Sequence, residues 1–468
     1  MNPAAILRRP RRLHRQQQHR VLLLTSGLGT GHSRAAAAIE QALEVQAPGT
    51  LTRTVDLWSM LDDSVVASIQ QSYLRVVTEY PDLYQRLYQL DQHSWRNILD
   101  HGLPLPALLR ELHGLIEPLA EAHASGSERH WLDRLLYRQL LAMLAGSGPA
   151  DARLREFWQQ ATIHRIWRLL TKRLQHQVER FAPDVIVATQ VTMAALAANV
   201  KTRRRLAVPL IGVITDYGVH DFWQQEQINL YCVADESMTP RLSRHTRDQS
   251  RIAVTGIPLL PEFANLPSSQ EARQKLNLDV NRPLILILGG GLGLGIDAVV
   301  RALADHLPHH ATAPTLIILA GRNQNVGRDV MDWPETRDAF SRGRIQVHGW
   351  TDHVSTYIRA ADVVIGKPGG LTTAEVLACG RPLFSTSSLR GQESFNVAYL
   401  ENNGVGQLLA EEHLVHRIPD LLDDKLTLQR MQSRAWALGK RNGAQLIAAR
   451  VLKLVLHQSY RDASEQSG

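Results

Sequence analysis

A glycine turn that opens a helix is the stretch of this sequence best suited to bind a ligand. Residues 366–375 read Gly-Lys-Pro-Gly-Gly-Leu-Thr-Thr-Ala-Glu and follow an apolar run that ends at Ile365. Gly369 and Gly370 would let the backbone approach a ligand closely, and the first N–H groups of the helix favour an anion. Glu375 lies about one helical turn further on, where a carboxylate could accept hydrogen bonds from a ribose diol. Taken alone, the turn is equally compatible with tight packing of a strand against a helix.

A second polar motif follows the next expected strand. Residues 391–396 read Gly-Gln-Glu-Ser-Phe-Asn. Parallel strands end at the same edge of a sheet, so we expect this motif beside the glycine turn. Gln392, Glu393 and Asn396 would supply amide and carboxylate groups, which are suited to sugar hydroxyls.

The chain begins with a similar unit of strand, glycine loop and helix. The apolar run 21–25 leads into Ser-Gly-Leu-Gly-Thr-Gly-His-Ser at 26–33, and a strong helix pattern follows. The loop lacks the full dinucleotide fingerprint, and Asp56 only comes closest to the acidic residue that such a site needs. Taken alone, His32 is more often a helix cap than a catalyst. Its imidazole can nevertheless hold a proton near neutral pH, which makes it a candidate general base.

Two further strand ends carry candidate groups. Asp216 follows the apolar run 209–215, at the end of a strand where doubly wound folds place ligand groups. His220 is either a partner of that carboxylate or an ordinary loop residue. The run Gly-Gly-Gly-Leu-Gly-Leu-Gly at 289–295 follows the apolar run 282–288 and forms a second phosphate-type loop.

These motifs require a scaffold in which strands and helices alternate. The alternation runs through two long stretches, which predicts an α/β fold with two Rossmann-like, doubly wound domains that face each other across a cleft. We place the segments as a basic disordered tail at 1–20, an N-terminal domain at 21–255 with a helical insertion at about 98–155, a linker at 256–269, a C-terminal domain at 270–450, and the end of a C-terminal helix with a tail at 451–468.

Composition excludes several classes of protein. The 468 residues carry a formal net charge of +7, and six arginines of the acid-free first twenty residues supply most of it. The rest of the chain is therefore nearly neutral, which argues against a nucleic-acid binder. Two cysteines are too few for a disulfide framework or a zinc site and are expected as buried thiols in a reducing cytoplasm. No apolar run approaches the roughly 20 residues that span a bilayer, and no secretory signal is expected.

Two segments could contact a membrane. The basic tail is either an electrostatic contact with anionic lipid headgroups, a solvated tail, or a transit peptide. Residues 62–91 carry tyrosines at helical spacing, among them Tyr84. These rings could lie at a lipid surface or could face an ordinary core. We expect a mixture of the two.

Several motifs in a common order resemble one family. They are G-K-P-G-G-L-T-T-A-E, then G-Q-E-x-x-N, the first loop G-x-G-x-G-H, the series T-D, H and W at 215–223, and the tyrosine-rich segment at 73–88. This order is similar to the monogalactosyldiacylglycerol synthases and the processive diacylglycerol glucosyltransferases. It is more distantly similar to the lipid-intermediate N-acetylglucosaminyltransferase of peptidoglycan synthesis. The sequence departs from the family at Leu28 and Thr30, which replace glycines, and at 387–390, where P-x-P is usual; the last change leaves the sugar open.

The resemblance implies a GT-B glycosyltransferase that moves galactose or glucose from a UDP-sugar to diacylglycerol with inversion. The N-terminal domain would take the acceptor and the C-terminal domain the nucleotide sugar, without a metal or another cofactor. The implied catalytic residues are His32 and Asp216. The implied nucleotide-sugar residues are Gly290, Gly291, Arg322, Trp350, Thr351, Gly369, Gly370, Leu371, Thr372, Glu375, Gln392, Glu393 and Asn396. The implied acceptor-side residues are Gly29, Gly31, Tyr84 and His220.

Other functions remain open from the sequence. The same fold could serve another lipid or polyprenyl acceptor, or a sugar-nucleotide epimerase. A peripheral membrane protein that senses UDP-sugar without turnover is the non-enzymatic alternative. The expected location for each membrane-active version is the cytoplasmic face of the membrane, in contact with anionic lipids and without nucleic acid.

Overall fold

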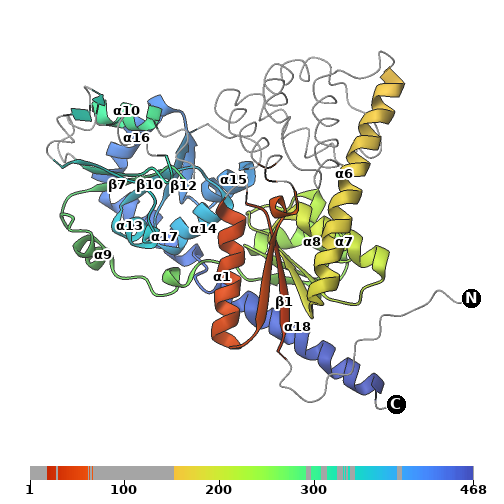
Figure 1. Cartoon of the computed structure of the whole chain (residues 1–468). Coiled ribbons are helices and arrows are strands. Elements are labelled where there is room, and N and C mark those ends of the chain that lie inside the picture. Colours follow the sequence, from red (N-terminus) through yellow and green to blue (C-terminus); the bar gives the residue numbers. More distant parts are fainter. Residues whose placement is uncertain are drawn as a thin grey trace, which may run out of the picture.

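The computed structural model of the chain contains two α/β halves (Figure 1). The structure describes residues 18–27, 30–61, 152–290, 297–306, 314–323, 343–386 and 393–466, together with positions 63, 66, 330, 332, 333, 336 and 337. The predicted insertion lies outside these residues up to 151, as does the predicted basic tail up to 17. Within the described part, no helix is long and apolar enough to cross a membrane.

The first half is built on a parallel sheet in the order β2-β1-β3-β4-β5-β6. Its strands are β1 (Arg20–Thr25), β2 (Leu51–Asp56), β3 (Val185–Ala188), β4 (Leu210–Val213), β5 (Leu230–Val233) and β6 (Ile252–Val254). The helices packed on it include α1 (Thr30–Gln46), α6 (Ala152–Phe181), α7 (Val191–Arg204) and α8 (Thr239–Thr246).

The second half repeats the plan in the order β12-β11-β10-β7-β8-β9. Its strands are β7 (Leu284–Leu288), β8 (Thr315–Leu319), β9 (Ile345–His348), β10 (Val363–Gly366), β11 (Leu383–Thr386) and β12 (Gly406–Leu409). Its helices are α9 (Ser269–Lys275), α10 (Asp297–His306), α13 (Val354–Ala360), α14 (Gly370–Ala378), α15 (Ser394–Asn402), α16 (Glu411–Asp423) and α17 (Lys425–Leu438). The predicted class of two doubly wound domains is confirmed.

The central strands are uniformly apolar because helices cover both faces of each sheet. Strands β3, β4 and β7 are buried at every position. The edge strand β2 differs, since it reads Leu-Thr-Arg-Thr-Val-Asp and buries only Val55. Its partly solvated position explains why the sequence shows no clear second strand.

The last helix returns to the first half. Helix α18 (Gly443–Gln466) packs against α1 and lies across the base of the first sheet, in dark blue in Figure 1. Its side chains Ile447 and Val451 are buried in one cluster with Val21 and Leu23 of β1. The chain therefore leaves the second domain before Gly443, several residues earlier than the boundary at 450 that the sequence suggested.

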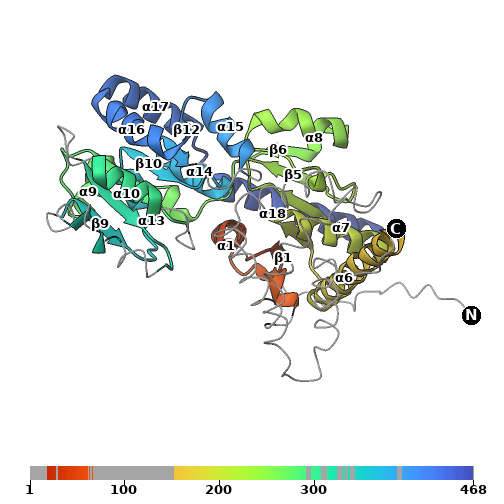
Figure 2. The same cartoon turned by 90° about the horizontal axis from the view of Figure 1, so that it is seen from above.

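In each sheet, the order in which successive strands are added reverses at one strand. In the first, β2 lies on one side of β1 and β3 on the other; in the second, β8 lies on one side of β7 and β10 on the other. Ligands of doubly wound folds bind beyond the carboxyl ends of the strands at this reversal. The loops after β1, β3, β7 and β10 are thus placed to form sites, and Figure 2 shows the two halves side by side, with α1 close to α14.

Candidate functional site

The carboxyl ends of strands from both halves meet at one contact. A Cβ added to Gly31, at the start of α1, would lie 3.7 Å from the Cβ of Leu371, at the start of α14. Gly370 packs so closely on Thr215 that an added Cβ would collide with its carbonyl oxygen. Figure 1 shows α1 and α14 together at the centre of the molecule. The two glycine-opened helices therefore share one site.

His32 lies in the first turn of α1, and its ring nitrogen Nδ1 contacts residues that follow two other strands. Its Nδ1 is 3.0 Å from the carbonyl oxygen of Thr189 and 2.9 Å from Oγ1 of Thr215. Because a carbonyl can only accept, Nδ1 of the neutral ring carries the proton and Nε2 the lone pair. None of the described residues hydrogen-bonds to Nε2, so that nitrogen is available to a bound hydroxyl group.

The surroundings of His32 favour its neutral form. Burial lowers its pKa below the usual value, and the hydrogen bond with Thr189 opposes this effect only in part. At neutral pH the ring is therefore unprotonated and able to accept a proton. Thr189 directly follows β3 and Thr215 comes two residues after β4, so the ends of these two neighbouring strands fix this geometry.

Asp216, the other predicted catalytic residue, faces the second domain. Its Oδ1 accepts a hydrogen bond of 3.1 Å from Nδ2 of Asn396 and another from the backbone N–H of Gly370. Burial raises the pKa of Asp216 to about 6, and these hydrogen bonds and the charge of Lys367 limit the rise. The carboxylate thus lies at the N-terminus of α14, where an anion is stabilised.

The two implied catalytic residues, His32 and Asp216, have different hydrogen-bond partners in the structure. Among the described residues no hydrogen bond joins their side chains, and Thr189 and Thr215 hold the imidazole instead. The reason is local: successive residues after a strand point to opposite sides, so Thr215 turns toward α1 while Asp216 turns toward α14.

Glu375 lies on α14 and is almost fully buried. Its Oε1 forms an ion pair of 3.0 Å with Nη2 of Arg34, which comes from α1 in the other domain. Burial raises the pKa of Glu375 to about 7; Arg34 lowers it, and the neighbouring carboxylate of Glu262 raises it. Glu375, which we predict to bind the ribose, is therefore a carboxylate whose ionisation depends on an arginine of the first domain.

The second motif also contacts the first domain. Asn396 is fully buried, and its Oδ1 accepts a hydrogen bond of 2.8 Å from the backbone N–H of Tyr217. Glu393 is buried beside Lys367, with 2.9 Å between Oε1 and Nζ. Burial raises the pKa of Glu393, while Lys367 lowers it. Both predicted sugar ligands thus line the domain contact, with protein partners for their polar groups.

Three of the implied nucleotide-sugar residues lie near the β9 edge of the second sheet. Trp350 follows β9 and is 49% exposed, and the guanidinium of Arg322 lies 4.9 Å from its ring centre. Thr351 accepts a hydrogen bond of 3.1 Å from the backbone of His353. An exposed indole beside a strand end offers a face on which a pyrimidine could stack.

The remaining predicted residues fall into two groups. Gly290 follows β7 with a φ of +63°, a conformation that favours glycine, and Thr372 lies in the first turn of α14. His220 caps a short helix, since its Nδ1 accepts a hydrogen bond of 3.2 Å from Phe222, and burial lowers its pKa. Four predicted residues lie outside the described part of the chain: Gly29, Tyr84, Gly291 and Gln392.

Sequence reasoning missed four residues that the structure brings to this site. They are Arg34, Thr189, Thr215 as a partner of His32, and Lys367. Thr189 had a usable signal, because it ends an apolar strand as Asp216 nearly does. Arg34 had none, because its partner is more than three hundred positions away in the sequence.

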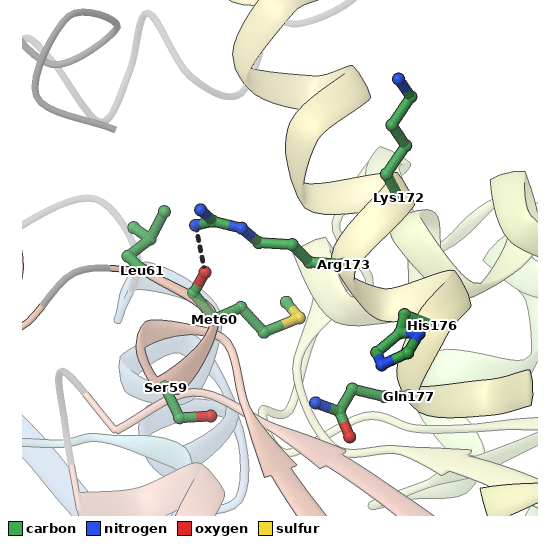
Figure 3. A pocket seen from close by; sticks show the side chains of 7 residues that line it. All are labelled: Ser59, Met60, Leu61, Lys172, Arg173, His176 and Gln177. Carbon is green, nitrogen blue, oxygen red and sulfur yellow. Dashed lines mark hydrogen bonds between the residues drawn. The ribbon is translucent and has the colours of Figure 1, made fainter. Parts of the chain in front are cut away.

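A separate cavity lies in the first domain away from this contact. It has a volume of about 410 Å³ and lies between α6 and the short helix at Trp58–Met60 (Figure 3). Lys172, Arg173 and His176 project from α6 around it, and Arg173 donates to the carbonyl oxygen of Met60. Basic, polar and apolar side chains therefore line the cavity together.

Two family models match different parts of the chain. The model of monogalactosyldiacylglycerol (MGDG) synthase matches residues 150–259, and that of the glycosyltransferase family 28 C-terminal domain matches residues 284–451. These matches fall on the first and second sheets respectively, so the resemblance drawn from the motifs is confirmed.

Homologues include lipid glycosyltransferases. The processive diacylglycerol beta-glucosyltransferase of Bacillus subtilis is 26% identical over 288 residues, which are 61% of this chain and 73% of that protein. The chloroplastic monogalactosyldiacylglycerol synthase of Spinacia oleracea is 29% identical over 241 residues, 49% of this chain and 44% of that protein.

Solved structures support the fold. MurG of Acinetobacter baumannii aligns with a TM-score of 0.52 at 13% identity, covering 93% of this chain and 99% of that one. The UDP-GlcNAc 2-epimerase of Neisseria meningitidis also reaches 0.52, at 11% identity, covering 93% of this chain and 100% of that one. At such identities the likeness concerns the fold alone, and the predicted GT-B architecture is confirmed.

Proposed function

We propose that the protein is an inverting glycosyltransferase that moves galactose or glucose from a UDP-sugar to diacylglycerol. The observation that carries the proposal is the contact of α1, which carries His32, with the glycine turn and Glu375 of the second domain. Homologues that are named diacylglycerol glycosyltransferases support the choice of acceptor. The UDP-sugar follows from the order of the motifs in the second domain.

In this reaction the acceptor hydroxyl oxygen attacks the anomeric carbon, and the bond from that carbon to the UDP oxygen breaks. Nε2 of His32 takes the hydroxyl proton, while Nδ1 keeps its contacts with Thr189 and Thr215. A positioned base of this kind contributes a rate factor of about 10² to 10⁴. The attack comes from the face opposite UDP, so the configuration at the anomeric carbon inverts.

The second domain would hold the donor. Glu375 would accept hydrogen bonds from the ribose, Trp350 would stack on the uracil, and Glu393 and Asn396 would contact the sugar. The N–H groups of Gly290 and Gly369 and the dipole of α14 would stabilise the leaving diphosphate. In our proposal, these groups stabilise the negative charge of the diphosphate without a metal or another cofactor.

Asp216 would compete with the donor for a further N–H group of the same glycine turn, that of Gly370. Its carboxylate already accepts the N–H of Gly370 at the start of α14. A diphosphate that used the same N–H group would displace Asp216, because two anions cannot share one donor without repulsion. We therefore propose that Asp216 moves when the donor enters and that His32 alone is the base.

We further propose that the protein works at the cytoplasmic face of the membrane in contact with anionic lipids. The cavity beside α6 supports this proposal, because the exposed Lys172 lines it together with Met60 and Leu61 (Figure 3). Basic side chains next to apolar ones suit a lipid headgroup and the first part of its chains. Binding to vesicles should weaken as salt is raised.

The experiment is the release of UDP by the purified full chain. UDP-galactose and UDP-glucose are tested with vesicles that contain diacylglycerol, with diacylglycerol-free vesicles, and without lipid. The proposal predicts release only with diacylglycerol, together with a glycolipid product. Equal release without lipid would point to a soluble acceptor and would overturn the choice of diacylglycerol.

A further inference from the structure

Arg34 is the one charged side chain of α1 that the structure brings to Glu375, the carboxylate that we predict to bind the donor. It lies two residues after His32 and crosses from the first domain to Glu375 in the second. The arginine side chain is 25% exposed and the carboxylate 5%. The helix that carries the base thus also carries the counter-charge of the predicted ribose ligand.

The ion pair differs from an ordinary surface pair. An exposed pair contributes little, because water solvates both charges when they separate. A carboxylate that is nearly buried has no such alternative and takes up a proton when its cation is removed. Arg34 is therefore in a position to decide whether Glu375 is charged.

The other charged groups near Glu375 do not replace Arg34. Glu262, between the domains, acts in the opposite sense, because its negative charge favours the protonated form of Glu375. The thiol of Cys379, at the end of α14, is held neutral by burial, which raises its pKa far above the usual range. The guanidinium of Arg359, from α13, is turned to the backbone oxygens of Pro267 and Cys379.

We propose that Arg34 is a positioning residue of the donor site, which holds Glu375 as an oriented carboxylate for the ribose diol. The inference rests on the proposed function in one respect, namely that the diol of a UDP-sugar is what Glu375 binds. A charged carboxylate has two acceptor oxygens, whereas the protonated group must donate with one of them. Loss of Arg34 therefore weakens donor binding without touching the base.

A second consequence concerns the order of events. Arg34 reaches Glu375 only while α1 lies against α14, as it does here. Arg34 thus holds Glu375 in its charged form in the same arrangement that brings His32 to the site. Donor binding and the arrival of the base favour each other through this one contact.

The test compares Arg34→Gln and Arg34→Lys with the wild-type chain. Dissociation constants for UDP are measured by calorimetry between pH 6 and pH 9, and kcat and KM for the UDP-sugar are measured beside them. The matched control is Arg204→Gln, which removes an exposed arginine from its ion pair with Glu179 in the same domain. Thermal unfolding of each variant reports whether it is folded.

In Arg34→Gln we expect UDP to bind about five- to tenfold more weakly at pH 7, because a rise of one unit in the pKa of Glu375 removes most of its charged form there. The loss should shrink above pH 8.5, as Glu375 ionises again. Arg34→Lys should recover part of the affinity, kcat should change less than KM, and Arg204→Gln should match the wild type.

Two results would overturn the role of Arg34. One is unchanged UDP affinity in both variants at every pH. The other is a loss that is equal at all pH values, since that would reflect altered packing. The readout is independent of turnover: a wild-type chain that binds UDP but transfers no sugar would refute the proposed function while still deciding the role of Arg34.

Discussion

Helices α1 and α14 meet at the contact between the domains, yet they present opposite chemistry. Helix α1 follows β1, the strand at the reversal of the first sheet, α14 follows β10, the neighbour of β7 in the second, and each begins in a glycine-rich turn. In α1, burial lowers the pKa of His32, which keeps a base neutral. In α14, burial raises the pKa of Glu375 to about 7, and an arginine from α1 opposes the rise. The same desolvation therefore prepares one helix to accept a proton and makes the other depend on its partner.

This difference suggests a division of work between the two helices. His32 of the first would act on the reaction rate, and Glu375 of the second, with Arg34 as its counter-charge, would act on donor affinity. Substitutions in α1 and α14 can separate these effects, because kcat and the dissociation constant for UDP are measured independently.

The largest effect is expected from His32→Ala. Removal of the base should lower kcat by about 10²- to 10⁴-fold, while UDP binds as it does to the wild type. Steady-state kinetics with diacylglycerol vesicles and calorimetry with UDP provide the two numbers. Asp216→Asn is the comparison: it should lower kcat less than His32→Ala, since Asp216 makes no hydrogen bond to His32. An equal or larger loss in that variant would make Asp216 the base.

Gly370→Ala should break the contact between the helices. An added Cβ at Gly370 would collide with the backbone of Thr215, whereas one at Gly369 has its nearest neighbour 3.9 Å away, at Oε1 of Glu393. We expect kcat/KM to fall by about tenfold or more in Gly370→Ala, because overpacking of this kind costs about 1–3 kcal/mol. Gly369→Ala is the comparison: it keeps the N–H group that would contact the diphosphate and meets no backbone of the first domain, so it should lower kcat/KM less than Gly370→Ala. Similar activity of the two variants would mean that the domains do not close in this way during turnover.

The pH profiles of kcat and kcat/KM should fall at different pH values, because one depends on His32 of α1 and the other on Glu375 of α14. Glu375 loses its charge as pH falls through about 7, so kcat/KM for the donor should decrease below that pH. Burial lowers the pKa of His32 below its usual value of about 6.5, so the ring stays neutral, and kcat should stay constant, to a lower pH than kcat/KM. Rate profiles from pH 5 to 9 test this order. A single common limb for kcat and kcat/KM would contradict the separation.

The smallest effect is expected beside the site, at Tyr399. Its ring stacks on Tyr217 with 4.1 Å between centres, and its hydroxyl donates to Asp235 over 3.1 Å. Tyr399→Phe keeps the stack and removes the hydrogen bond, which should cost about 1 kcal/mol of unfolding free energy. Denaturant unfolding gives the value, and kcat should be nearly unchanged. A large loss of activity would extend the catalytic contact to α15.

Much of the fold could be predicted from local patterns. Buried parallel strands such as β3 and β7 are continuous apolar runs, and a glycine turn marks the end of β7, so periodicity and turn residues located them. The edge strand β2 escaped because its polar residues face solvent. The elements on which α18 packs in the first domain could not be predicted locally, since an apolar helix face does not identify its partner.

The site was predictable only where one segment contains its own signal. Glycine turns and strand-end carboxylates identified Gly370, Glu375 and Asp216 as candidates from the sequence. The partner of each was not predictable, because Arg34 with Glu375, and Gly370 with Asp216, join segments from different domains. Such pairs depend on how the domains close, which no local pattern encodes.

The division of work is tested most directly by the dissociation constant for UDP of three chains: wild type, His32→Ala and Glu375→Ala. Calorimetry at pH 8, where Glu375 is charged, gives the three values under one condition. We predict that His32→Ala binds UDP as tightly as the wild type, while Glu375→Ala binds at least tenfold more weakly, the loss expected of buried hydrogen bonds to a charged group. Wild-type affinity in Glu375→Ala, or a loss confined to His32→Ala, would contradict the assignment of the donor to α14 and of the base to α1.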